Sequence, residues 1–353
     1  MALENVSCVL NHYPDGEVKI DDLKVVKSEV PELGDNDVLL KVLCCSVDPF
    51  MRGRMKKENP SSYVPPFQEG KVLQVFSVTQ VEKIGAGVTD IKVGDKYMCF
   101  NGIEKYTVVP QQVIKGDGQK NLGNFNKIDP NNPMKDSFYL GLMGMPGMTA
   151  WAFFNKAGKP KEGETIFVTA AAGAVGQVVC QLAKLKGLRV VACASSPEKI
   201  GFLKGALKVD EAFSYRDFPD KQSFVAQLRK VCPNGIDIYY DNVGGYILDS
   251  ALEVMNVHGR VVMCGMISQY NLKDKYKYTL QDITSRRLTL QGCLFNDYFP
   301  QCMGEFMQDM IPKLQARQLI YQEHIYKGVE KTPEAFAGLF KSQNFGKVII
   351  EPF

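Results

Sequence analysis

Two glycines three residues apart, Gly173 and Gly176, have the spacing of a turn that binds phosphate groups. They lie between a predicted buried strand, 165–169, and a predicted helix, 176–187. Gly173 lets the backbone approach a pyrophosphate, and Gly176 lets the helix pack closely, while free N–H groups at a helix start attract an anion. Ala171 occupies the place of the usual first glycine, and such turns also occur without a ligand. Inside a strand–turn–helix unit, however, the pattern predicts a dinucleotide site. Its predicted contacts are Ala172, Gly173, Ala174, Val175 and Gly176.

The end of the next predicted strand, 189–193, distinguishes between two nicotinamide cofactors. An NAD enzyme usually has an acidic residue about 20 residues after the turn, which holds the ribose hydroxyls. Here Ser195 and Lys199 follow the strand, and hydroxyls beside an ammonium group suit a 2′-phosphate. The sequence therefore predicts NADPH. Lys199 has an alternative interpretation, as a solvated surface lysine. Glu198, the acidic residue next to it, has the alternative role of the first-turn acid of a predicted helix, 197–207.

Metal ligands and hydrolase motifs are absent from the sequence. The histidines His12, His258 and His324 lie far from one another and from any close cysteine pair, and no C-x-x-C occurs. Zinc sites need such clusters. Neither a G-x-S-x-G elbow nor a G-x-x-x-x-G-K-[ST] loop is present. We therefore expect no metal, and we expect the chemistry to come from the cofactor and from hydrogen bonds.

The elements around these motifs predict two domains. Residues 1–135 contain short apolar runs, such as 38–43 and 71–76, between turn-forming residues, which favours a barrel or folded sheet. From about residue 163, strands alternate with helices, which is typical of βαβ units and a parallel sheet. Later strands are predicted at 236–240 and 260–264.

The C-terminal part does not continue the alternation of strands and helices. Residues 303–343 are predicted to be a helical tail, and 346–351 a last strand that returns to the first domain.

Composition and charge exclude several classes of protein. The chain has 353 residues, 42 of them basic and 39 acidic, so its net charge is +3. This balance is not that of a nucleic-acid-binding protein, and the composition excludes a disordered chain. Most of the ten cysteines lie in apolar runs, where reduced cysteine behaves as a small hydrophobic residue. With neither a signal peptide nor a membrane span in the sequence, we expect a cytoplasmic protein that binds neither membrane nor nucleic acid.

Seven segments resemble the zinc-independent branch of the medium-chain dehydrogenase/reductase superfamily, in particular the plant NADPH-dependent double-bond reductases, or 2-alkenal reductases, and the prostaglandin reductases. They occur in the family's order and span almost the whole chain. The segments are Asp48–Arg52, Gly144–Ala150, Ala170–Gly176, Asn234–Asp237, Asp241–Gly245, Cys264–Asn271 and Asn344–Lys347.

The resemblance implies an α/β fold. A GroES-like domain would cover 1–135 and be completed by about 315–353, and a Rossmann domain would cover 136–314. It also implies a homodimer, and an enzyme that uses NADPH to reduce the α,β double bond of enals and enones. The substrate would be a small α,β-unsaturated carbonyl compound, and hydride would reach its β-carbon.

The resemblance also implies roles for single residues. Lys199 and Ser195 would hold the 2′-phosphate, Tyr215 would pack on the adenosine, and Tyr270 would stabilise the enolate. The other implied cofactor contacts are Pro49, Thr149, Asn242, Cys264, Ser268, Tyr270, Cys293, Leu294, Phe295 and Asn344. The implied substrate contacts are Phe50, Tyr63, Tyr270 and Phe295. Purely structural readings stay open for three of these residues: Tyr215 in a small core, Asn242 in a strand-ending turn, and Tyr270 as an ordinary loop residue.

Two positions depart from the family pattern. Phe50 stands where many plant members have tyrosine, so that a phenol is lost, which Tyr63 would replace. Trp151 stands where a tyrosine is common. Two other functions also remain open: a quinone reductase with the same cofactor site, and an inactive nucleotide-binding homologue.

Overall fold

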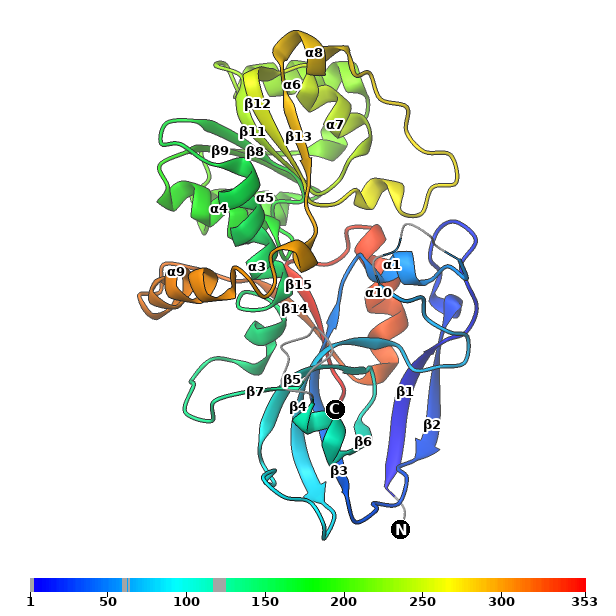
Figure 1. Ribbon diagram of the computed structural model, residues 1–353. Coiled ribbons are helices and arrows are strands. Elements are labelled where there is room, and N and C mark those ends of the chain that lie inside the picture. The colour runs from blue at the N-terminus through cyan, green and yellow to red at the C-terminus, as the bar shows by residue number, and fades with distance from the viewer. Residues whose placement is uncertain (1–2, 59–61, 63, 117–124) are drawn as a thin grey trace. The chain divides into compact units, whose positions relative to one another are not determined.

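The computed structural model describes residues 3–58, 62, 64–116 and 125–353, which form two compact units (Figure 1). The first unit comprises Met1–Gly144, His324–Asn344 and Val348–Phe353. The second unit comprises Met145–Glu323 and Phe345–Lys347.

The second unit contains a six-stranded sheet whose strands are all parallel. The strands are β8 (Thr165–Val168), β9 (Arg189–Ala194), β10 (Glu211–Ser214), β11 (Ile236–Asp241), β12 (Met255–Met263) and β13 (Thr289–Gly292). Their order in the sheet is β10-β9-β8-β11-β12-β13. This is the 3-2-1-4-5-6 order of a doubly wound nucleotide-binding sheet, in which ligands bind at the carboxyl ends of the strands where the order reverses. Here that point lies between β8 and β11.

Helices pack against this sheet, whose inner strands β8, β9 and β11 are buried along almost their whole length. The helices are α3 (Met145–Ala152), α4 (Gly176–Leu185), α5 (Pro197–Gly205), α6 (Lys221–Val231), α7 (Gly245–Leu252), α8 (Gln281–Arg286) and α9 (Met303–Gln315). A π-helix, Phe153–Gly158, continues α3, and short 3₁₀ turns occur at Tyr215–Asp217, Ile267–Gln269 and Phe295–Asp297. Phe224 of α6 and Ile247 of α7 pack with Phe167 and Tyr239 of the sheet in one continuous core.

The first unit is β-rich. Strands β1 (Glu4–Leu10) and β2 (Leu23–Glu29) form an antiparallel pair. The larger sheet contains β3 (Asp37–Val47), β4 (Gln74–Ile84), β5 (Lys96–Gly102), β6 (Tyr106–Pro110), β7 (Asn126–Lys127), β14 (Glu323–Lys327) and β15 (Lys347–Glu351). Its order is β14-β15-β3-β4-β5-β7, with β6 also paired to β3. The helices are α1 (Met51–Arg54), α2 (Gln111–Lys115) and α10 (Thr332–Phe340), and 3₁₀ turns occur at Ile20–Asp22, Asp136–Leu140 and Val329–Lys331.

The predicted fold class, a parallel α/β sheet with a separate β-rich part, is confirmed, but two predicted segments are wrong. Lys71–Phe76 is not one strand: Lys71 and Leu73 exchange backbone hydrogen bonds with β1 (3.2 and 3.0 Å), so β4 begins at Gln74. The predicted helical tail is interrupted by strand β14, which pairs with β15. A five-residue strand between two helices has too short an alternation to be recognised from sequence.

Candidate active site

The glycine turn between β8 and α4 is shaped by the backbone of Ala170. A Cβ at Gly176 would lie 2.5 Å from the carbonyl oxygen of Ala170, and a Cβ at Gly173 would lie 3.0 Å from the same oxygen. A larger residue at Gly176 would therefore displace backbone atoms. No side chain caps α4, whose cap residue is Val175. The start of the helix thus presents backbone N–H groups and a positive dipole end to an anion.

A second segment holds this turn in place. Gly346 donates its N–H to the carbonyl of Ala172 (3.1 Å), and the hydroxyl of Tyr321 donates to the carbonyl of Ala174 (3.2 Å). Gln177 and Gln322 exchange two further hydrogen bonds, of 3.0 and 2.7 Å. The turn is therefore fixed independently of any ligand.

Lys199 and Ser195 lie together at the end of β9, as a 2′-phosphate site would need. The ammonium group of Lys199 donates to the hydroxyl of Ser195 (2.9 Å), and Lys199 is only 8% exposed. Lys199 is thus not a solvated surface lysine. Burial, with the nearby charge of Arg216, lowers the pKa of Lys199 to about 8, although Glu198 opposes the shift. A buried cation beside a second cation provides an environment that an anionic ligand would stabilise.

Arg216 is a candidate site residue that the sequence analysis missed. Strands β9 and β10 are parallel with Ala194 opposite Ser214, so the residues that follow them, Ser195 and Tyr215, lie side by side. Arg216 comes next and is exposed. The sequence signal for Arg216 was the short strand Glu211–Ser214. A prediction of this strand would have placed the residues after it at the same edge of the sheet as Ser195.

Asp241, the last residue of β11, organises the point where the strand order reverses. Its Oδ1 accepts hydrogen bonds from Tyr239 Oη (2.6 Å) and from the N–H groups of Val243 and Gly244 (both 2.9 Å). Its Oδ2 is buried and has no hydrogen-bond partner among the described residues. Burial raises the pKa of this carboxyl, against the hydrogen bonds that it accepts.

Asn242 ties the ends of β8 and β11 together. Its side-chain amide donates to the carbonyl of Thr169 (2.8 Å), and its own N–H donates to Thr169 Oγ1 (3.0 Å). The structural reading of Asn242 as part of a strand-ending turn therefore holds for its amide nitrogen. Its amide oxygen takes no part in these two hydrogen bonds.

The loop after β12 lies against this turn and carries Tyr270. Ser268 donates from its N–H and its hydroxyl to the carbonyl of Val243 (3.1 and 2.6 Å). The phenol oxygen of Tyr270 accepts the N–H of Met266 (3.2 Å), and burial raises the pKa of the phenol. The phenol therefore stays protonated at neutral pH, and its hydrogen is available for an acceptor.

The ends of β12 and β13 place Cys264 and Cys293 on neighbouring strands, since Met263 is opposite Gly292. Leu294 follows, and Phe295 stacks on Phe299 with ring centroids 5.3 Å apart. Thr149 lies in α3, and its carbonyl accepts the hydroxyl of Tyr240 (3.3 Å).

Most of the predicted cofactor residues of the second unit thus follow the carboxyl ends of its strands, and Thr149 is the exception. Three of the predicted residues that the structure describes belong to the first unit: Pro49, Phe50 and Asn344. Phe50 packs against the core of that unit. Tyr63 lies outside the described residues.

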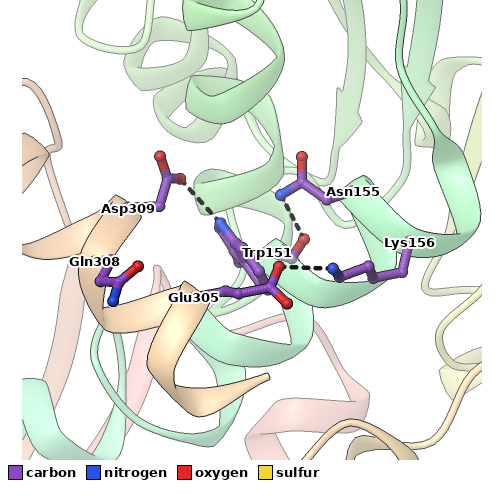
Figure 2. A pocket seen from close by; sticks show the side chains of 6 residues that line it. All are labelled: Trp151, Asn155, Lys156, Glu305, Gln308 and Asp309. Carbon is purple, nitrogen blue, oxygen red and sulfur yellow. Dashed lines mark hydrogen bonds and ion pairs between the residues drawn. The ribbon is translucent and has the colours of Figure 1, made fainter. Parts of the chain in front are cut away.

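Trp151 faces α9, where a polar depression lies on the second unit (Figure 2). Its indole N–H donates to Asp309 (2.9 Å), and Lys156 pairs with Glu305 (2.7 Å). Asn155 donates to the carbonyl of Trp151 (2.9 Å). Because these polar groups satisfy one another, the depression is a packing contact between helices and not a candidate catalytic site.

Replacing Trp151 by phenylalanine should lower the free energy of unfolding by about 1–2 kcal/mol, because the hydrogen bond to the carboxylate of Asp309 is lost together with part of the buried ring. Urea unfolding followed by circular dichroism measures this change. Asp309→Asn, which keeps an acceptor for the indole, should cost less. Equal stability of Trp151→Phe and the unchanged protein would contradict the assigned contact.

Among the described residues, no group of three or more His, Cys, Asp or Glu side chains is placed to hold a metal ion. Nor does any described helix have the length and apolar character needed to cross a membrane.

Comparison with known proteins gives consistent matches over the whole chain. Residues 174–312 match the family model of zinc-binding dehydrogenases, and 7–115 match that of the N-terminal domain of oxidoreductases. The chain is 38% identical to the NADP(+)-dependent 2-alkenal reductase of Nicotiana tabacum, covering 99% of this chain and 97% of that protein. It is 35% identical to the NADPH-dependent curcumin reductase of Escherichia coli, over 97% and 95% of the two chains.

A solved structure, CurA of Vibrio vulnificus in complex with NADPH, superposes with a TM-score of 0.87. It is 34% identical to this protein, with 99% of both chains covered. The order of the strands and the glycine turn indicate a dinucleotide-binding sheet, and the similarity to a structure solved with NADPH agrees with this. The chain belongs to the zinc-independent medium-chain dehydrogenase/reductases, in the family of NADP-dependent double-bond reductases.

Proposed function

We propose that the protein reduces the α,β carbon–carbon double bond of 2-alkenals and enones with NADPH. The observation that carries this proposal is the similarity to a 2-alkenal reductase over almost the full length of both proteins. Candidate groups for this chemistry lie at the strand ends of the second unit.

The residues of the second unit fit NADPH. Gly173 and Gly176 leave room where a Cβ would meet backbone, and α4 begins without a side-chain cap. Lys199, Ser195 and Arg216 would hold the 2′-phosphate, with Tyr215 on the adenosine. When bound, NADPH supplies the hydride that reaches the β-carbon of the substrate.

Tyr270 is the proposed electrophilic group. Hydride addition at the β-carbon places negative charge on the carbonyl oxygen of the substrate, and a donor aimed at this oxygen stabilises the enolate. The phenol suits this role because its raised pKa keeps it protonated and its oxygen is already held by Met266. A proton from water or a tyrosine then completes the α-carbon. Phe295, Phe50 and Tyr63 are the proposed substrate contacts.

The direct test is to follow NADPH consumption with four substrates: a short enal, a cinnamaldehyde-type enal, a benzalacetone-type enone and a quinone. Mass spectrometry of the product identifies the bond that is reduced. We expect a saturated carbonyl compound from the enals and the enone. A quinol as the main product would favour the quinone reductase, and NADPH binding without any turnover would favour an inactive homologue.

The affinity for NADPH should decrease at alkaline pH. The 2′-phosphate binds the charged form of Lys199, and this form is lost as the pH of the free enzyme rises through about 8. The KM for NADPH should therefore rise by up to about tenfold per pH unit above that value. NADH, which lacks the phosphate, is the control. A KM for NADPH that stays constant between about pH 7 and 9 would refute the lowered pKa of Lys199.

We also infer a homodimer in the cytoplasm. Strand β13 is at the edge of the sheet and is mostly exposed, so its backbone groups are available to a second copy. All ten cysteines are free, as in a reducing compartment. Sedimentation at several protein concentrations tests the dimer, and a monomer throughout would contradict it.

A further inference from the structure

Two thiols meet at the carboxyl ends of neighbouring strands, β12 and β13. These strands are parallel and their last pair is Met263 opposite Gly292, so that Cys264 and Cys293 are the first residues after this pair. The N–H of Cys293 donates to the carbonyl of Met263 (3.2 Å), which belongs to the bridge between Met263 and Gly292 and holds Cys293 beside the end of β12. Strands in a sheet lie about 4.8 Å apart, which is within the range of Cα separations that a disulfide bridges, about 4.4–6.8 Å.

A phenol group lies near each of the two thiols. The hydroxyl of Tyr298 donates to Cys293 Sγ (3.9 Å), and the thiol of Cys293 donates to the carbonyl of Gln291 (3.6 Å). The hydroxyl of Tyr240, which donates to the carbonyl of Thr149, interacts electrostatically with the thiol of Cys264. The two thiols interact electrostatically with each other. Seven of the ten cysteines are buried, whereas Cys264, Cys293 and Cys302 are partly exposed. The two residues therefore differ from the core cysteines in being partly exposed and in following the last pair of two neighbouring strands.

We propose that Cys264 and Cys293 form an oxidisable dithiol, whose conversion to a disulfide by a diazene or peroxide oxidant lowers turnover. With a diazene, the thiolate of Cys293 adds to one nitrogen of the N=N bond, and the other nitrogen takes a proton. The thiolate of Cys264 then attacks the sulfur of Cys293, and the S–N bond breaks. The S–S bond forms as the diazene leaves as a hydrazine, so two thiols lose two electrons and two protons that the oxidant gains.

The predicted loss of turnover follows from the loop that begins at the end of β12. This effect on turnover rests on the proposed function. Cys264 begins the loop that presents Ser268 and Tyr270, and its N–H donates to the carbonyl of Asp241 (2.9 Å). A disulfide draws its two Cβ atoms to about 3.8 Å. The resulting shift of the loop would misplace Tyr270, and a misplacement of about 1 Å can cost a hundredfold in rate.

Both thiols react slowly at neutral pH. Burial raises the pKa of Cys264 to about 12 and also raises that of Cys293, which the hydrogen bond from Tyr298 lowers in part. Since the thiolate is the reacting form, the oxidation is run at mildly alkaline pH with excess diamide.

The experiment treats the full-length enzyme with diamide, blocks the remaining thiols with N-ethylmaleimide and maps the cross-linked peptides. The digestion includes cleavage at Asp297, which separates Cys293 from Cys302. We expect a peptide that joins Cys264 to Cys293, loss of the mass of two hydrogens, and a fall in kcat of about tenfold or more that dithiothreitol reverses. Cys302→Ser is the matched control and should respond as the unchanged enzyme does.

Cys264→Ser and Cys293→Ser, each compared with its own untreated sample, should not be inactivated by diamide. Absence of the Cys264–Cys293 peptide, or a main cross-link through Cys302, would overturn the assignment of the pair. A mapped disulfide with unchanged kcat would overturn its effect on turnover. If no enone is reduced even before oxidation, the proposed function fails, while the peptide map still decides whether the dithiol forms.

Discussion

Replacing Lys199 by alanine should raise the KM for NADPH about a hundredfold and leave the KM for NADH nearly unchanged. The substitution removes a buried cation that is 2.9 Å from Ser195 and would form a charge-assisted hydrogen bond with the 2′-phosphate. Such a bond contributes about 1.5–3 kcal/mol, and a hundredfold change corresponds to about 2.7 kcal/mol. Steady-state kinetics with both cofactors, at saturating enal, measures the effect.

Two further variants make this test specific. Lys204→Ala removes an exposed lysine from the same helix, whose partner is Glu211 at 3.4 Å, and should not alter either KM. Arg216→Ala should raise the KM for NADPH by a smaller factor, about three- to tenfold, because Arg216 is exposed and its charge is screened. If Lys199→Ala changes both KM values equally, Lys199 acts on the fold of the site and not on the phosphate.

Replacing Tyr270 by phenylalanine should lower kcat about a hundredfold and change the KM for NADPH by less than about threefold. Removal of one preorganised donor to a developing oxyanion costs about 10²–10³ in kcat. The ring remains in place, so the loop keeps most of its packing. With NADPH deuterated at the transferred position, the isotope effect should increase, because hydride transfer becomes slower relative to the other steps.

Tyr278→Phe is the matched control for this variant. The phenol oxygen of Tyr278 accepts the N–H of Gly245 (2.9 Å), much as that of Tyr270 accepts the N–H of Met266 (3.2 Å). Both variants therefore leave one backbone N–H without its partner and should lose similar stability, about 1 kcal/mol. Only Tyr270→Phe should lose kcat by two orders of magnitude. Equal kcat values in the two variants would remove Tyr270 from the chemistry.

The sequence by itself was sufficient to predict those parts of the candidate site whose residues lie close together in the chain. The strand, glycine turn and helix from Thr165 to Leu185 are continuous, and their residue types specify the turn through contacts within a few residues. Ser195 and Lys199 are likewise brought together by one turn of α5, whose N-cap is Ser196. The fold class could be inferred as well, because strand–helix alternation allows few arrangements.

Only the tertiary structure decided which distant residues share an edge of the sheet. Arg216 approaches Lys199 because β10 pairs with β9, and Cys264 and Cys293 come together because β12 pairs with β13 up to Met263 and Gly292. Strand β14 likewise exists through its pairing with β15. The burial of Lys199 also excluded the interpretation of this residue as a solvated surface lysine. Such pairings and burial depend on contacts between segments far apart in the chain, which local propensity does not encode.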